Sequence, residues 1–330
     1  MDIPRTKLVF FGTPAFAAGT LEALVGAGYP VVAVVTAPDR PRGRSGAPVA
    51  PPVKLAAERL GIPVLQPGKL STLPDLVRPQ EPLLGVLFAY GRILPPQVLQ
   101  MFPHGILNIH PSLLPRHRGP APVVGAILDG SATTGVTIMI LDDQMDHGPI
   151  LGQQRVTIAP EETAQQLTSR LAEVGTTLLL SLLPRYVSGA LHPHPQPAAG
   201  ATVTRELRRE DGAIVWERSA RDLYNQYRAC DPWPGFYTWL GSRRLKLLDV
   251  GLDDAVSPVR KPGILQAADG KVVISAAAGA LVIGRLQLEG GVPIEASAWL
   301  RGHPDARGAR LRTPQPPAPT RSPADDSGTA

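Results

Sequence analysis

The first 187 residues alternate short aliphatic or β-branched runs with segments of helical pattern, and this alternation restricts the fold more than any other feature of the sequence. We expect strands at 8–11, 31–36, 62–65, 83–89, 105–110 and 136–141, and helices at 14–25, 53–60, 96–101 and 162–184. Strands that alternate with helices build a mostly parallel sheet. The sequence therefore predicts an α/β fold with a Rossmann-like, doubly wound, mostly parallel sheet.

The turn after the first strand looks like a dinucleotide-binding turn but departs from that pattern. In G-x-G-x-x-G the second glycine allows the backbone to approach a pyrophosphate closely, and the third allows close packing of the helix on the strand. Starting at Gly12, those two positions hold Pro14 and Ala17. We prefer a plain helix start, with Thr13 as N-cap and Pro14 as the first helical residue.

The chain changes character after residue 187. Residues 188–201 have the composition of a linker, in which His192 and His194 are expected to be solvated. Residues 202–312 are expected to be helical in parts of 205–227 and then to form a small β-barrel domain with a closing helix at 294–300. Its strands are expected at 236–240, 245–250, 263–267, 272–275 and 281–288, and residues 313–330 form a tail expected to be disordered.

Charge and cysteine content narrow the class of protein. The net charge of the whole chain is +5, but residues 40–118 carry a local +7, residues 119–201 a local −4, and residues 202–312 a local +4. Basic clusters suit a polyanionic partner, although ordinary solvated surface can also carry them. A single cysteine, Cys230, excludes a multi-cysteine metal site, and we expect no bound metal. The start lacks the apolar stretch of a signal peptide, so a cytoplasmic protein is expected.

Two polar side chains end the strand expected at 105–110. Asn108 and His110 are two residues apart and so point to the same face, while Ile109 points to the opposite one. Two donors aimed at one point can stabilise a carbonyl oxygen that becomes an oxyanion. An Asn that caps a turn, or a His that fills a polar surface, is the plain structural alternative for each residue alone.

An acidic loop follows the strand expected at 136–141. It contains Asp142, Asp143 and Asp146, and Gly148 comes two residues later. A carboxylate here would favour the charged, donating form of His110. Asp146 and Gly148 could also form only a turn. Asn, His and Asp together suit acyl transfer in which the substrate itself supplies the nucleophile.

Several motifs resemble those of a known family. NIHPSLLP at 108–115, followed by DHG at 146–148, resembles the N-x-H-x-S-L-L-P and D-x-G signature of the folate-dependent formyltransferases. Within that superfamily, GTPAFA at 12–17, FAYGRILP at 88–95 and CDPWPG at 230–235 are similar to the methionyl-tRNA formyltransferases, as is the loop PDRPRGR at 38–44. The resemblance runs from about Leu8 to about Pro304.

The resemblance implies both an activity and a set of site residues. It implies transfer of the formyl group of 10-formyltetrahydrofolate to the free amine of methionine on the initiator tRNA, by a monomer without a membrane partner, and an oligonucleotide-binding-fold-like (OB-fold-like) C-terminal barrel. Asn108, His110 and Asp146 would be catalytic, with protonated His110 and Asn108 holding the oxyanion. The folate would contact Ser112, Leu113, Leu114 and Pro115 and lie in an apolar pocket that includes Phe88, Tyr90, Gly91 and Ile93.

Two departures from the family pattern leave alternatives open. Arg42 and Arg44 are the expected tRNA contacts, but Gly46 and Ala47 replace the lysines that are common after this arginine. Pro111 stands where the methionyl-tRNA formyltransferases often have Gly, and the glycinamide-ribonucleotide formyltransferases often have Pro at this position. One alternative is therefore a formyltransferase that acts on a small amine. The other is a non-catalytic RNA-binding protein, although the intact set of Asn108, His110 and Asp146 argues against it.

Overall fold

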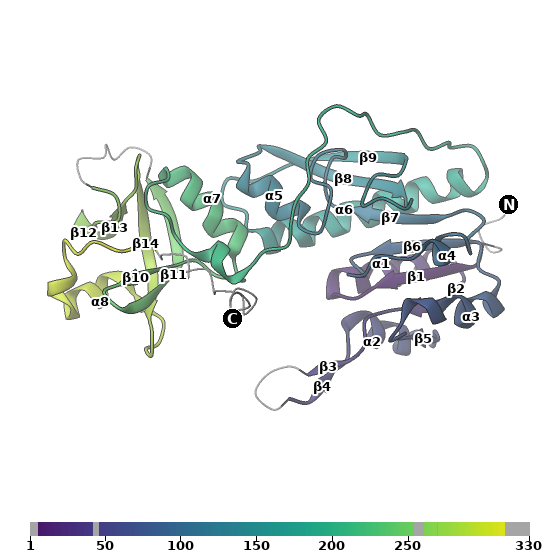
Figure 1. The fold of residues 1–330 in the computed structure, drawn as a ribbon, viewed down its shortest axis with the longest axis horizontal. Coiled ribbons are helices and arrows are strands. Elements are labelled where there is room, and N and C mark those ends of the chain that lie inside the picture. Colours follow the sequence, from purple (N-terminus) through teal and green to yellow (C-terminus); the bar gives the residue numbers. More distant parts are fainter. Residues whose placement is uncertain (1–5, 42–45, 254–260, 269, 314–330) are drawn as a thin grey trace, which may run out of the picture. The chain divides into compact units, whose positions relative to one another are not determined.

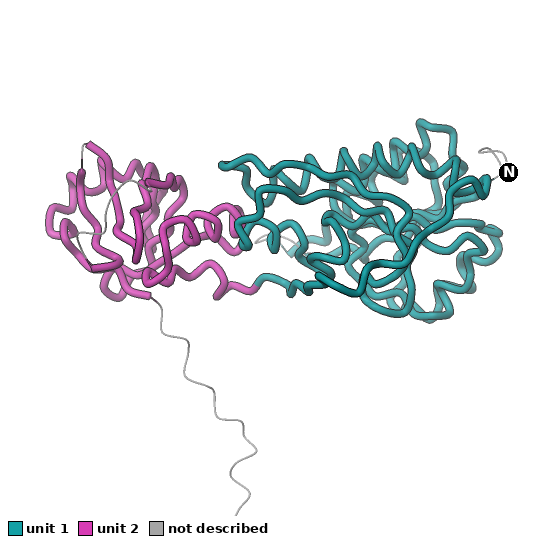
Figure 2. The backbone as a smooth tube through the Cα atoms, turned by 90° about the horizontal axis from the view of Figure 1, so that it is seen from above, with its two compact units in different colours: residues 1–207 teal, residues 208–330 magenta. Residues whose placement is uncertain are grey.

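A computed structural model describes residues 6–41, 46–253, 261–268 and 270–313. The chain divides into two compact units, residues 1–207 and residues 208–330 (Figure 2). Arg42, Arg44 and all of the predicted tail except Thr313 lie outside the described residues. In the part of the chain that the structure describes, no helix is both long enough and apolar enough to cross a membrane.

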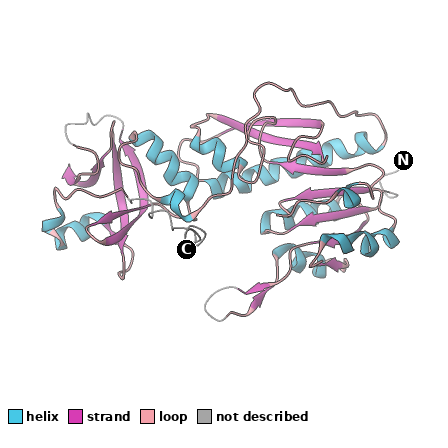
Figure 3. Ribbon diagram, in the orientation of Figure 1, coloured by secondary structure: helices cyan, strands magenta, loops and turns pink. Residues whose placement is uncertain are grey.

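Unit 1 is built on one seven-stranded sheet (Figures 1 and 3). Neighbouring strands are parallel from β5 to β7, whereas β8 runs antiparallel to both β7 and β9, so the predicted mostly parallel sheet is confirmed. In spatial order the strands are β5 (Val64–Leu65), β2 (Val31–Val35), β1 (Leu8–Gly12), β6 (Leu84–Phe88), β7 (Ile106–His110), β8 (Thr133–Ile140) and β9 (Ile150–Thr157).

Helices cover both faces of this sheet. Leu73 and Val77 of α3 (Leu73–Val77) and Val98 of α4 (Pro96–Leu99) pack in one core cluster with Val9 and Phe11 of β1. The opposite face carries α6 (Ala164–Val187), which contacts β7, β8, β9 and also α1 (Ala15–Gly26). The remaining helices of the unit are α2 (Pro52–Arg59) and α5 (Pro122–Leu128).

Helices α1 and α6 differ from the sequence prediction at their ends. Pro14, not Thr13, is the N-cap of α1, and the Thr13 hydroxyl is directed at the carbonyl of Tyr90, to which it donates at 3.0 Å. Helix α6 begins one residue after Thr163, whose side chain forms a reciprocal capping box with Gln166. It continues past Pro184, where we expected it to end, as far as Val187.

Strand β9 was not predicted. Its middle residues Gln153, Gln154 and Arg155 are polar and exposed, and the strand lies at the edge of the sheet. Edge strands often carry polar and charged side chains, so their pattern resembles that of a loop. On the other side of the unit, the short strands β3 (Arg40–Pro41) and β4 (Pro48–Val49) pair with each other where only a loop was expected.

Unit 2 has its own core around an antiparallel sheet, consistent with the predicted barrel. The strand order is β10 (Tyr237–Leu240), β11 (Arg243–Asp253), β14 (Ala280–Leu288), β13 (Lys271–Ser275) and β12 (Leu265–Ala268), with β15 (Ile294–Glu295) beside β14. Residues 309–312 bridge its two edges, since Leu265 donates to Ala309 and Arg312 donates to Trp239. The unit also contains α7 (Ala220–Cys230) and α8 (Ala296–Gly302).

Candidate active site

Strand β7 presents the predicted pair of donors at its carboxyl end. Asn108 and His110 are buried and point to the face that carries α3 and α4. Ile109 points the other way, onto α6, where a Cβ on Gly175 would lie 2.6 Å from its side chain. The alternation expected from the sequence therefore holds, and the close approach of α6 keeps this part of β7 in place.

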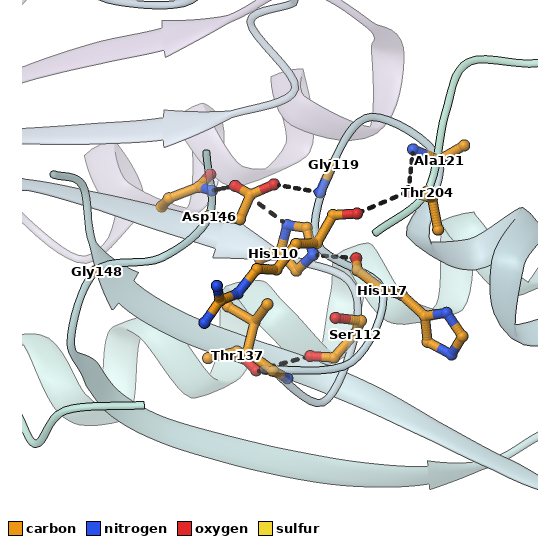
Figure 4. Close-up of polar contacts among 12 residues, drawn as sticks. His110, Ser112, His117, Gly119, Ala121, Thr137, Asp146, Gly148 and Thr204 are labelled. Atoms are coloured by element: carbon orange, nitrogen blue, oxygen red, sulfur yellow. Dashed lines mark hydrogen bonds and ion pairs between the residues drawn. The ribbon is translucent and has the colours of Figure 1, made fainter. Parts of the chain in front are cut away.

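Asp146 lies directly beside this pair (Figure 4). One carboxylate oxygen, Oδ1, accepts from the Asn108 amide at 3.4 Å and lies 3.6 Å from Nδ1 of His110. The other, Oδ2, accepts from the backbone N–H of Gly119 at 2.7 Å. Asp146 has a φ of 49°, a left-handed conformation in which Asp is better tolerated than most residues. The Asn108 amide and Nδ1 of His110 thus converge on one oxygen, Oδ1 of Asp146.

A backbone carbonyl orients the His110 ring. Nε2 of His110 lies 2.9 Å from the carbonyl oxygen of His117, which can only accept, so Nε2 carries a hydrogen. Nδ1 is then the nitrogen that faces Asp146. His117 itself has a φ of 58°. Two left-handed residues, His117 and Asp146, therefore surround one imidazole, and backbone strain of this kind is concentrated at functional sites.

The ionisation of His110 differs from the sequence expectation. Burial lowers the pKa of His110 below its ordinary value, while the Asp146 carboxylate and the bond to His117 act in the opposite direction. At 3.6 Å the approach of Asp146 is longer than a hydrogen bond, so it does not offset full burial. The lowered pKa favours the neutral imidazole, in which Nδ1 can accept a proton.

Gly148 lets the acidic loop turn back against β8. A Cβ at this position would collide with the backbone carbonyl oxygen of Ile140 at the end of that strand. Only glycine has no Cβ, so this position requires glycine for packing. The D-x-G motif in this chain therefore does more than form a turn, because the packing of Gly148 also places Asp146.

The SLLP residues shape the loop beside Asn108 and His110. The Ser112 hydroxyl donates to the carbonyl of Arg116 at 2.7 Å, and the Ser112 carbonyl accepts from Thr137 at 2.7 Å. The backbone N–H of Leu114 donates to the same Thr137 hydroxyl at 3.1 Å, and the Leu114 side chain packs on Met139 and Ile150. Their contact with folate stays a prediction.

A cavity of about 200 Å³ opens beside Asn108 and Asp146. Of the residues expected in the folate pocket it includes Ile93, whose side chain is 78% exposed. Phe88 lies on the opposite face of β6, packed on Phe16, and Tyr90 is buried against Phe11. The cavity is lined by Leu87, Arg92, Ile93, Leu94, Leu99, Asn108, Leu141, Asp142, Asp143, Gln144, Met145 and Asp146.

Other groups near the site were not found by sequence reasoning. The N–H of Gly119 and the carbonyl of His117 are backbone atoms, which leave no side-chain signal. Gln196, Thr202 and Thr204 come from the predicted linker and the residues just after it. They contact the acidic loop and residues 115–121 although they are distant in sequence.

Two family models together cover most of the chain. A model described as "Formyl transferase" matches residues 6–195, and one described as "Formyl transferase, C-terminal domain" matches residues 206–304.

Curated relatives and solved structures agree with these matches. Methionyl-tRNA formyltransferase of Chloroflexus aurantiacus is 44% identical over 90% of this chain and 96% of its own length. That of Roseiflexus castenholzii is 45% identical over 92% and 98%. In fold, the chain is similar to an N-formyltransferase from Helicobacter canadensis solved with folinic acid and dTDP-3-aminofucose (TM-score 0.66, 19% identity, 84% of this chain and 97% of that one). The chain belongs to the formyltransferase family, among the methionyl-tRNA formyltransferases.

Proposed function

We propose that this protein transfers the formyl group of 10-formyltetrahydrofolate to the free amine of methionine on initiator methionyl-tRNA, for translation initiation in the cytoplasm. The observation that supports it most directly is the convergence of the Asn108 amide and Nδ1 of His110 on Oδ1 of Asp146. This arrangement provides an oxyanion donor, a proton acceptor and a carboxylate within one buried site.

The reaction needs each of these three groups. The neutral amine attacks the formyl carbon, and the Asn108 amide stabilises the tetrahedral oxyanion. Nδ1 of His110 accepts the proton that the amine loses, and the Asp146 carboxylate stabilises the imidazolium that forms. His110 then returns the proton to the folate nitrogen that leaves. Because the substrate supplies the nucleophile, the Ser112 hydroxyl can remain bonded to Arg116 throughout.

The cavity beside Asn108 suits the ring end of a folate. Its volume of about 200 Å³ is below the range of roughly 300–1,000 Å³ typical of whole-ligand pockets, so the rest of the molecule would lie outside it. Leu87, Leu94 and Leu141 supply apolar wall, and the Asp142–Asp146 loop supplies polar groups. For the tRNA, we propose phosphate contacts from Arg42 and Arg44 and from the basic C-terminal unit.

One assay separates this proposal from its alternative. The protein is incubated with 10-formyltetrahydrofolate and, in parallel, Met-tRNA, glycinamide ribonucleotide or an amino-sugar nucleotide, and formylated product is measured. We expect Met-tRNA to be the preferred acceptor. Formylation of a small amine in its place would overturn the proposal, and no formylation of any acceptor would leave a non-catalytic RNA-binding role.

The pH dependence of the rate reports the state of His110. Because burial lowers the pKa of His110, we expect kcat/KM to rise with pH through a limb below about 6.5. Asp146→Asn removes a charge that raises this pKa, so its limb moves to lower pH while its plateau rate falls. Ionisation of the methionyl amine is common to both proteins and cancels in the comparison. A rate that falls as pH rises through this range would mean that imidazolium is the active form.

The two units are expected to separate folate binding from tRNA binding. A fragment of residues 1–207 contains the sheet, the catalytic set and the cavity, so it should fold and bind folate. It should use Met-tRNA poorly. In the full chain, weak tRNA contacts from both units strengthen each other through effective concentration, and the fragment loses the contacts of unit 2. Circular dichroism, folate titration and titration of labelled tRNA test this. A folded fragment that binds tRNA as well as the full chain does would show that unit 2 is not a tRNA-binding module.

A further inference from the structure

The segment that leads out of unit 1 is not a free linker. We call residues 194–204 the strap. Its composition is that of a flexible connection, and most of its residues are exposed. It is nevertheless anchored at its start, where His194 and Ile150 exchange backbone hydrogen bonds of 2.9 and 2.8 Å. At its end, Arg118 and Val203 form a parallel backbone bridge.

Gln196 is the central contact of the strap. Its Nε2 donates to the carbonyl of Asp146 at 2.9 Å and to the carbonyl of Gly148 at 2.8 Å. Its Oε1 accepts from Nε and Nη2 of Arg118 at 3.1 and 2.7 Å. One half-buried amide thus ties the acidic loop to the loop at 115–121. Both loops supply groups to the catalytic set.

Thr202 and Thr204 hold the backbone of the 115–121 loop. The Thr202 hydroxyl accepts from the N–H of His117 at 2.8 Å, and its carbonyl accepts from the N–H of Arg118 at 2.9 Å. The Thr204 hydroxyl donates to the carbonyl of Arg118 at 2.9 Å and lies 3.2 Å from the N–H of Ala121, for which it is the acceptor (Figure 4).

The loop held in this way carries the two backbone groups that orient the catalytic side chains. The carbonyl of His117 lies 2.9 Å from Nε2 of His110, and the N–H of Gly119 donates to Asp146 at 2.7 Å. The strap therefore contacts Asp146 directly, through the hydrogen bond from Gln196 to its carbonyl, and reaches His110 through His117.

We propose that the strap is a positioning element of the active site, in which Gln196 and Thr202 set the relative placement of Asp146 and His110. This inference rests on the proposed formyl transfer for its rate measurement. Gln196 fixes Asp146 through the backbone on the carboxylate side, and Thr202 fixes His117 on the imidazole side. A displacement of about 1 Å in such a pair can lower a rate by about 10², so the strap contributes to turnover without touching either substrate.

Full-length variants test the proposal. Gln196→Met keeps the length of the side chain and removes all its polar contacts, and Gln165→Met makes the same change at an exposed site on α6. Thr202→Val removes the hydroxyl, and Thr202→Ser restores it. We expect Gln196→Met and Thr202→Val to lower kcat about tenfold or more, with KM for both substrates changing less than about threefold. Thr202→Ser and Gln165→Met should stay within about twofold of the wild type.

A second readout does not depend on turnover. The imidazole of His110 is titrated by NMR in the free protein, where Asp146 raises its pKa. If Gln196→Met lets Asp146 move away, the His110 midpoint moves to lower pH, whereas Gln165→Met leaves it unchanged. This shift is expected even if the wild type fails to formylate Met-tRNA, an outcome that would overturn the proposed function alone.

Three results would overturn the positioning role. One is a wild-type kcat together with a wild-type His110 titration in Gln196→Met. Another is an equal loss in Thr202→Ser and Thr202→Val, because the hydroxyl would then not be responsible. The third is a loss of folate binding together with a thermal midpoint far below that of Gln165→Met, because Gln196 would then serve general stability.

Discussion

Asn108→Ala is expected to lower kcat for formyl transfer by about 10²–10³, the usual cost of removing one oxyanion donor. The expected loss is large because the Asn108 amide is a buried donor at the end of β7, 3.4 Å from Oδ1 of Asp146 and beside the cavity. Single-turnover measurement with saturating folate and Met-tRNA checks it. Folate affinity should change little, since the apolar wall of the cavity comes from other residues.

His110→Ala should cost at least as much, because it removes the proton acceptor and leaves the partly buried Asp146 carboxylate without its neighbour. His192→Ala is the matched control: it lies in an exposed part of the chain and should turn over normally. Near-normal turnover in both site variants would refute the assignment of Asn108 and His110 to the chemistry.

Gly148→Ala is expected to lose activity to a similar extent without touching a catalytic side chain. The new Cβ would collide with the carbonyl of Ile140, so the backbone of the acidic loop must move. Asp146 lies two residues away and would be displaced from Asn108 and Gly119. We expect kcat to fall by about 10² or more, with a lower thermal midpoint in the same protein.

Gly19→Ala provides the control for this change. Gly19 lies inside α1, and a Cβ there meets nothing within 4 Å. Alanine in a helix interior stabilises by roughly 0.5–1 kcal/mol relative to glycine, so this variant should melt slightly higher and keep its rate. A Gly148→Ala protein with the rate of Gly19→Ala would show that the loop adapts without moving Asp146.

The geometry of the proposed catalytic set could be predicted because its information lies in side chains and in strand periodicity. Asn108 and His110 are two apart in a strand, so their shared face follows from the sequence. The same periodicity, applied to β6, places Leu87 and Phe88 on opposite faces. The structure puts Leu87 at the cavity and Phe88 against Phe16. The sequence prediction placed Phe88 in the folate pocket because it did not apply this alternation to β6.

Other parts could not be predicted, because backbone atoms and long-range contacts decide them. The hydrogen bond from Gly119 to Asp146 involves a group that every non-proline residue has. Thr13 satisfied the rules for an N-cap, but Pro14 is the cap and the Thr13 hydroxyl donates to the carbonyl of Tyr90, 77 positions away. The protonation of His110 depends on how far burial outweighs Asp146, and a sequence gives neither burial nor distance.

The strap has a consequence for how such enzymes can be recombined. Connections between domains are the usual places for domain insertion and for building chimaeras. In a chimaera of two related enzymes, a junction at residue 194 or 201 would take all or part of the strap from one parent. The loop at 115–121 and the acidic loop would come from the other parent. Gln196, Thr202 and Arg118 form one hydrogen-bonded set and must be inherited together. Crossovers that preserve turnover are therefore expected after residue 204, close to the boundary at residue 207.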